Sequence, residues 1–242
     1  MSPQVRVRPW GINFFATASV VTLVIYAVVA GFGMLASAND LISLRALKSG
    51  IEVSGSAIDS LFVLHDALHG LRVIALWLCA IPVVAWIYQA NVGARALGAT
   101  GISFSPFASV IWFVVPVAYL WMPYRAVSQV WRASHDPEGW REARVPNHVR
   151  WWWGLWVLLN LSNRALRSLA TNLEGIDSYI QFGYLSQVNN LVALLASVLL
   201  IVLIRRLARK QEEEYRRFDF EGQVVVGASG TPQSVFASKA TW

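Results

Sequence analysis

Long apolar segments separated by short polar ones dominate the hydrophobic pattern of this chain. The clearest apolar runs cover residues 13–35, 71–88 and 188–204. Each is close to the roughly 20 residues that an α-helix needs to cross the hydrocarbon core of a bilayer. Helices are the expected form because lipid offers the backbone no hydrogen-bond partners. The pattern therefore predicts an all-α polytopic membrane protein.

A further span is predicted over residues 151–170, which are less apolar than the other three runs. The segment opens with three consecutive tryptophans, and polar side chains return after a short apolar stretch. To cross the membrane, this helix must carry two arginines into the bilayer with it. With this segment the predicted transmembrane helices number four.

The segment 104–122 lies between the second and third predicted spans and is interrupted by proline. Pro106 and Pro116 lie inside it, and Pro123 follows directly. A proline inside a helix removes a backbone hydrogen bond and clashes with the preceding turn. We therefore expect a re-entrant or kinked element that is buried by its neighbours, with the three prolines as structural hinges. A fifth complete span is the alternative.

Amphipathic interfacial helices are predicted outside the spans. Apolar residues recur at helical spacing in two stretches within residues 36–70, which we expect to cap one membrane face. The stretch 124–134 places Trp131 on an apolar face and both Arg125 and Arg132 on the opposite face. That arrangement is typical of a helix that lies in the membrane interface.

Two tails flank the predicted membrane domain, which covers residues 13–211. Residues 1–12 form a short basic tail. Residues 212–242 form a second tail, and we expect it to be largely disordered from about residue 220 because that segment is rich in glycine, serine and alanine.

Composition and charge agree with a membrane location. The chain has 242 residues, of which 56% are hydrophobic and only 14% are charged, and its mean hydropathy is +0.48. Soluble domains carry about 25% charged residues. The net charge of +6 is clustered in a few segments, which indicates membrane orientation rather than nucleic-acid binding.

The distribution of lysine and arginine constrains the orientation only in part. Cytoplasmic loops normally carry the excess of these residues. Four spans with both termini in the cytoplasm and five spans with an external N-terminus satisfy this rule equally well. The prolines of the central segment favour four spans, as does the gathering of tryptophans beside basic residues at one interface.

Several motifs make the chain similar to a known family. They are WIYQANVGARALG, then FSP, then FVVPVAYLWMPYRAVSQVWRAS, then a span led by two tryptophans, and finally IVLIRRLARKQ. Over residues 60–212 the chain resembles the bacterial membrane family known as domain of unknown function 4328. The most specific part is Pro116 followed by Pro123, Tyr124 and a Trp-Arg-Ala-Ser segment.

The resemblance implies a bacterial inner-membrane protein and supports the architecture, but it implies no reaction, ligand or catalytic residue. Relatives often begin with a soluble leader rich in proline and glycine, which suits a cytoplasmic N-terminus. Relatives often carry asparagine where this chain has Tyr119, so a role for a polar amide at that position does not transfer.

Arg164 and Arg167 are the leading candidates for a binding site. They lie three residues apart and so share a helix face, at a depth where charged groups often have a function. Together with Asn160 and Asn163 they could line a cleft for an anionic headgroup or substrate. The alternative is a structural role, in which the arginines reach the interface and pair with acidic residues, namely Glu174, Asp177 or Asp66.

The basic segments near the predicted interface suggest contact with membrane lipids or with a protein partner. Next to a membrane, such a surface meets anionic lipid more readily than nucleic acid. A homo-oligomer is a further option, and we expect no nucleic acid. The residues predicted to lie at the interface are Arg125, Trp131, Arg132, Trp151, Trp152 and Trp153.

No catalytic or metal-binding constellation is visible in the sequence. His65 and His69 are spaced to share a metal, but no third ligand is evident, and Cys79 is the only cysteine. We expect no cofactor and no metal. The hypothesis is a non-enzymatic membrane protein that binds lipids or a partner through its basic cytoplasmic surface; the alternative is a small transporter or channel-like protein with an anion site at Arg164 and Arg167.

Overall fold

The computed structural model describes residues 11–52 and 54–226, and within this part of the chain every regular element is a helix. Most of the first tail and residues 227–242 of the second tail lie outside the described residues. The side chains of His65 and His69 lie outside them too. The elements are α1 (Ile12–Lys48), α2 (Gly55–Ala96), α3 (Ala108–Ile111), the 3₁₀ helix η1 (Ala118–Leu120), α4 (Met122–His135), α5 (Asn147–Ala170) and α6 (Gly175–Val226).

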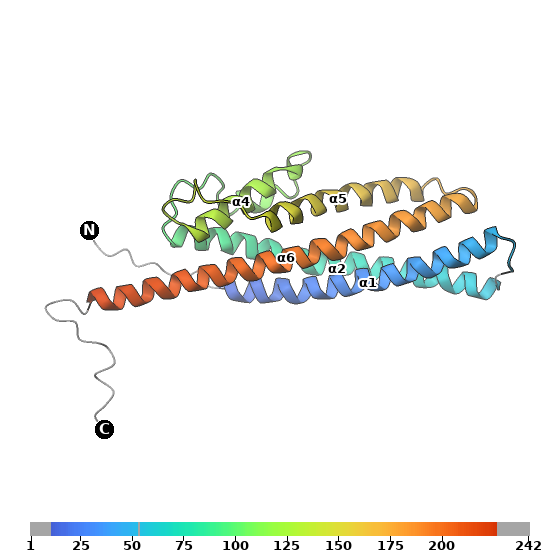
Figure 1. Cartoon of the computed structure of the whole chain (residues 1–242), viewed down its shortest axis with the longest axis horizontal. Helices are drawn as coiled ribbons and strands as arrows, with labels where there is room; N and C mark the ends of the chain where they lie inside the picture. Colours follow the sequence, from blue (N-terminus) through green and yellow to red (C-terminus); the bar gives the residue numbers. More distant parts are fainter. Residues whose placement is uncertain (1–10, 53, 227–242) are drawn as a thin grey trace, which may run out of the picture.

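Four long helices lie side by side and alternate in direction (Figure 1). α1 packs along α2 and α6, and α6 also packs along α5. The start of α1, the end of α6 and the whole of α4 lie at one end of the bundle, which we call the α4 end (Figure 1). The opposite end, where residues 171–174 join α5 to α6, we call the hairpin end.

Apolar side chains cover the outside of the bundle as well as its core. On α1, Val24, Val28 and Phe32 are each about half exposed, and Trp77 and Ile81 of α2 are two-thirds exposed. Helices that are apolar on all faces are typical of membrane spans. Three helical segments of the described chain are long and apolar enough to cross a membrane: Ile12–Lys48, Gly70–Ala96 and Gly175–Arg217.

Small residues let the long helices approach closely. Ala30 on α1 and Ala193 on α6 are fully buried. A Cβ atom added at Gly183 would lie 2.7 Å from the Leu41 side chain, so α6 passes α1 almost without space between them. Small residues are the usual means by which helices pack in lipid, where the hydrophobic effect gives little drive for association.

The amphipathic segments within residues 36–70 belong to the long helices instead of forming separate interfacial ones. α1 continues from its apolar run to Lys48 because residues 36–48 contain no glycine or proline, and Gly50 (φ 81°) then turns the chain. α2 already begins at Gly55. At the other terminus, α6 remains helical as far as Val226, past the residue at which the sequence predicts disorder.

The central segment is broken at its prolines. Pro106 comes shortly before the single turn of α3, and Pro123 lies in the first turn of α4. Between α3 and η1 the Ala118 amide donates to the Pro116 carbonyl at 2.7 Å, which closes a three-residue turn. Its central residue, Val117, has φ 65° and ψ −51°. A β-branched residue rarely adopts this strained conformation.

The helix α4 is packed inside the α4 end rather than laid along its surface. It contacts α2 and α6, and most of its residues are buried, including Gln129 on the face that the sequence predicts to be polar. On that face the Gln129 side-chain oxygen accepts from the Ser103 amide at 3.1 Å. The preceding loop therefore covers α4, and Arg125 is left as its exposed residue.

Candidate functional site

A cluster of polar side chains lies between the helices, in the half of the bundle towards the hairpin end. Arg72 of α2 donates through Nη1 to the side-chain oxygen of Asn190 on α6, at 2.5 Å. Asn190 is 4% exposed, and its neighbour Asn189 is fully buried. The side chain of Asn190 fits because α1 carries a glycine beside it: a Cβ at Gly33 would lie 3.2 Å from the Asn190 amide nitrogen.

The Asn189 amide connects this pair to α5. In the orientation that satisfies its neighbours, its oxygen accepts from Arg72 Nη2 at 2.8 Å. Its nitrogen then donates to the Ser162 hydroxyl at 2.6 Å and lies 3.3 Å from the Asn163 oxygen. Because buried polar groups are costly unless they are hydrogen-bonded, this network fixes α2, α5 and α6 relative to one another.

A pocket of about 190 Å³ adjoins the cluster and is bounded by α1, α2, α5 and α6. Its polar lining is basic or neutral, and no aspartate or glutamate belongs to it among the described residues. The polar side chains that line the pocket are Tyr26, Ser37, Arg72, Asn163, Arg167, Ser186, Asn189 and Asn190.

Of the four residues predicted to form an anion site, the structure places two at this pocket. Asn163 and Arg167 line it. Arg164 instead lies over the Tyr119 ring, with 5.4 Å between the guanidinium carbon and the ring centroid. The Asn160 amide donates to the Trp156 carbonyl at 2.8 Å, within α5. The two arginines therefore contact different surroundings despite sharing a helix face.

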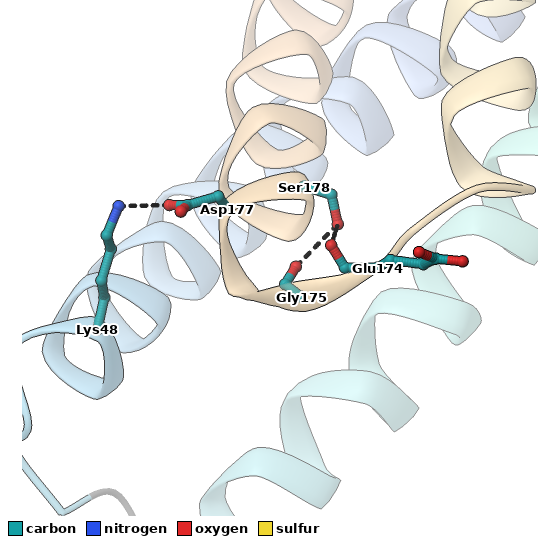
Figure 2. Close-up of polar contacts among 5 residues, drawn as sticks. All are labelled: Lys48, Glu174, Gly175, Asp177 and Ser178. Carbon is teal, nitrogen blue, oxygen red and sulfur yellow. Dashed lines mark hydrogen bonds and ion pairs between the residues drawn. The ribbon is translucent and has the colours of Figure 1, made fainter.

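Two of the acidic residues that could pair with Arg164 and Arg167, namely Glu174 and Asp177, lie at the hairpin end. Figure 2 shows Asp177, in the first turn of α6, paired with Lys48 at the end of α1. The Glu174 side chain points away from both, and the Glu174 carbonyl accepts from the Ser178 hydroxyl at 2.9 Å (Figure 2). Asp177 is therefore engaged by α1 and not by α5. The Asp66 side chain lies outside the described residues.

The three consecutive tryptophans have three different environments. Trp151 is 69% exposed, whereas Trp152 is 2% exposed. Trp153 is half-buried, and its ring nitrogen donates to the Leu120 carbonyl at 3.2 Å. Trp131 on α4 is also buried. Trp131 and Trp152 are thus core residues where the sequence predicts interfacial ones, since α4 and α5 turn these rings towards their neighbouring helices.

Exposed arginines gather at the α4 end. Arg125 lies in the first turn of α4, Arg150 lies in the first turn of α5, and Arg144 lies in the loop between these helices. Arg205 and Arg206 lie on α6 where its apolar run ends. Within the described part of the chain, none of these five is within salt-bridge distance of a carboxylate. Their charge is thus directed to solvent.

Two more arginines lie against the ring of Trp140. It is 6% exposed, and its ring nitrogen donates to the Thr100 carbonyl at 2.9 Å. The guanidinium carbons of Arg132 and Arg141 lie 5.5 Å and 5.6 Å from its ring centroid. Such contacts hold a cation in place without neutralising it, so both arginines add to the positive potential of the α4 end.

Trp131 also packs against two histidines. The His135 ring stacks on it at 4.3 Å, and the His148 ring meets it edge-on at 5.0 Å. Burial lowers the pKa of His135, with a smaller contribution from Lys210 in the same direction; its hydrogen bond to the Trp131 carbonyl and the charges of Glu213 and Glu214 oppose the change. Burial also lowers the pKa of His148, assisted by Arg206 and His135.

These histidines predict a loss of stability in acid. A pKa that is lower in the folded than in the unfolded state means that the unfolded chain binds more protons. Stability should therefore be complete above about pH 6.5, the ordinary histidine value, and should fall as the pH falls below it. Thermal unfolding of the detergent-solubilised chain between pH 8 and pH 5.5 measures this. The change should be smaller in H148Q; an equal change in H148Q and the unaltered chain contradicts the prediction.

These features define a class: an integral membrane protein built as a helical bundle, with apolar outer faces. A profile of the family described as "Domain of unknown function (DUF4328)" matches residues 52–209. The chain belongs to this family. No curated protein and no solved structure gave a match.

The residues that share this pocket with Asn163 and Arg167 were not predicted from the sequence. Arg72 is the second residue of the predicted span 71–88, and Asn189 and Asn190 are the second and third residues of the predicted span 188–204. The only signal in the sequence was that each of these polar residues lies inside an apolar run, on a helix that must pack against other helices. To join the three residues into one site, it was necessary to know which helices face one another.

Proposed function

We propose that this protein crosses the membrane four times and binds anionic lipids of the cytoplasmic leaflet, or an acidic protein partner, through the α4 end. In this proposal it is not an enzyme. The observation that carries the proposal is the group of exposed arginines at the α4 end, none of which has a carboxylate within salt-bridge distance among the described residues.

The four-span topology rests on the alternating helices. α5 is 24 residues long, which corresponds to about 36 Å of helix. It runs beside α6, the most apolar of the candidate spans. A helix of that length beside a span is long enough to cross with it. Both ends of residues 97–146 then lie on the cytoplasmic side, and the segment 104–122 between them enters the bilayer and returns.

The basic residues support an orientation with the α4 end in the cytoplasm. Arg205 and Arg206 directly follow the apolar run of α6, and Arg150 precedes that of α5. Cytoplasmic flanks carry such residues in excess. Each arginine near an anionic bilayer surface contributes about 1 kcal/mol of attraction. The helix α4 is buried and therefore supports the residues of this surface. Because the surface lies beside the membrane, lipid is a nearer source of negative charge than a protein partner.

The alternative, a transporter with an anion site formed by Arg164 and Arg167, has weaker support. Arg164 lies over an aromatic ring, and Arg167 faces a different group of residues. In this arrangement the two arginines have different surroundings, which gives less support to a single shared site.

Lipid retention tests the proposal. The full chain is purified in mild detergent, and bound phosphatidylglycerol and phosphatidylcholine are counted by native mass spectrometry. The triple variant R144Q/R150Q/R206Q should retain phosphatidylglycerol several-fold less than the unaltered chain, because its charges at the headgroup level are removed. The matched control R45Q/K48Q alters the hairpin end and should retain it normally. Equal retention in the triple variant and the unaltered chain would overturn lipid binding by the α4 end.

A further inference from the structure

We propose that the pocket between α1, α2, α5 and α6 binds the phosphate group of an anionic phospholipid from the leaflet at the hairpin end. This site is separate from the basic surface of the α4 end, and none of its residues belongs to that surface. Four observations lead to it: its charge, the hydrogen bonds that hold Arg72, its depth along the helices, and its mixed lining.

Within the described part of the chain, no acidic side chain compensates the positive charge of the pocket. Arg72 bonds only to the neutral amides of Asn189 and Asn190 among the described residues. Arg167 makes no hydrogen bond or ion pair there, and the pocket has no described acidic lining residue. Two guanidinium groups placed at depth in a membrane are costly unless they meet an anion. An anionic ligand supplies what the lining lacks.

Arg72 is held in position before any ligand arrives. Its Nη1 and Nη2 donate to two amide oxygens, and those amides are fixed in turn by Ser162, Asn163 and the space left at Gly33. A guanidinium group has five N–H donors, so donors remain for a ligand. Because arginine presents its donors as a planar fork, it suits the oxygens of a phosphate group.

The depth of the pocket matches the headgroup region of one leaflet. Asn190 lies about 22 Å along α6 from Arg205, and Arg167 lies about 26 Å along α5 from Arg150, at 1.5 Å per residue. The hydrocarbon core is about 30 Å thick. If the arginines at the α4 end mark one surface of the core, the pocket lies just inside the opposite surface, where the phosphates of that leaflet begin.

The lining is amphipathic and reaches the outer face of the bundle. Val73 and Leu76 of α2 line the pocket and are 42% and 46% exposed, and Arg167 is exposed as well. Apolar side chains at the mouth and polar ones inside would suit a molecule with a phosphate and acyl chains. A free phosphate ion would use only the polar part. The apolar wall therefore favours a lipid as the source of the phosphate.

Binding of short-chain lipids tests this site without disturbing the fold. R167Q removes a charge that has no hydrogen-bond or ion-pair partner among the described residues, and A170W narrows the pocket while leaving both arginines, because Ala170 is an exposed lining residue. R164Q is the matched control, since Arg164 lies outside the lining. Each is introduced into the full chain that also carries R144Q/R150Q/R206Q, so that lipid at the α4 end contributes little.

The probes are dihexanoyl phosphatidylglycerol and inorganic phosphate, and binding is measured by calorimetric titration of the delipidated chain in detergent. We expect phosphatidylglycerol to bind, and to bind at least tenfold more weakly in R167Q and A170W but unchanged in R164Q. Equal binding in all three variants overturns the site. Inorganic phosphate that binds as tightly as the lipid overturns the lipid as its source. Since the two sets of substitutions alter opposite ends, this test can fail while the α4-end proposal stands, and the reverse also holds.

Discussion

Replacing Trp152 by alanine is expected to lower the free energy of unfolding by about 3–5 kcal/mol, as is usual for a buried aromatic ring. Trp152 is 2% exposed and packs edge-on against Trp153 at 5.7 Å. Its removal leaves a cavity that the surrounding helices cannot fill. The adjacent Trp151 is 69% exposed, so W151A should change the free energy of unfolding by less than about 0.5 kcal/mol.

Unfolding in mixed micelles with increasing denaturing detergent measures both variants on the same scale. The two substitutions remove the same side chain from the same helix, one residue apart. Only the direction of the ring differs. Equal losses for W151A and W152A would mean that α5 is rotated relative to the arrangement described above.

The second large effect is expected at Asn91, which fastens the central segment to α2. Its side-chain nitrogen donates to the Phe104 carbonyl at 3.1 Å and to the Ser109 hydroxyl at 2.6 Å. Its oxygen accepts from Arg95 Nε at 2.9 Å. N91L removes all three bonds at a fully buried position. The cost should be about 3 kcal/mol, because Asn91 is the donor to the Ser109 hydroxyl and the acceptor for Arg95 Nε, and both lose the bond that the buried amide makes.

Hydrogen exchange distinguishes loss of this attachment from general unfolding. In N91L, the backbone amides of residues 102–111 should exchange faster than in the unaltered chain, while those of α1 keep their protection. N172L is the matched control, since Asn172 is an exposed asparagine at the end of α5. Unchanged exchange over residues 102–111 in N91L would show that other contacts hold the central segment.

Features set by the local sequence were predictable here. The apolar runs identified three helices that are able to cross a membrane, because their length and composition are properties of a single segment. The motif around Pro116 and Pro123 identified the family. The prolines also predicted the broken segment 104–122, since proline acts on its own backbone and on the preceding turn.

Features set by the direction of side chains were not predictable. Trp151 and Trp152 are neighbours of the same type, yet one is exposed and the other is buried. The sequence grouped Arg164 with Arg167 because of their spacing, whereas Arg167 shares a pocket with Arg72, which comes from a distant part of the chain. Helical spacing gives the face that residues share but not which helix packs against that face.

The helix α4 illustrates the same limit. Its alternation of apolar and polar residues predicted a helix at the membrane interface, but the loop that contains Ser103 covers Gln129 on its polar face. An amphipathic pattern shows that two faces have different surroundings. It does not distinguish water from a polar loop of the same protein.

The four-span topology is the claim on which both proposed sites depend, and cysteine labelling in intact cells tests it most directly. In a chain with Cys79 replaced by alanine, single cysteines are placed at Ser49 and Ser103, both of which are exposed, and a membrane-impermeant maleimide is added. We expect the cysteine at position 49 to be labelled and the one at position 103 to be protected until the cells are lysed. Labelling at position 103 with protection at position 49 would mean that the central segment crosses the membrane and that the orientation proposed here is reversed for α1 and α2.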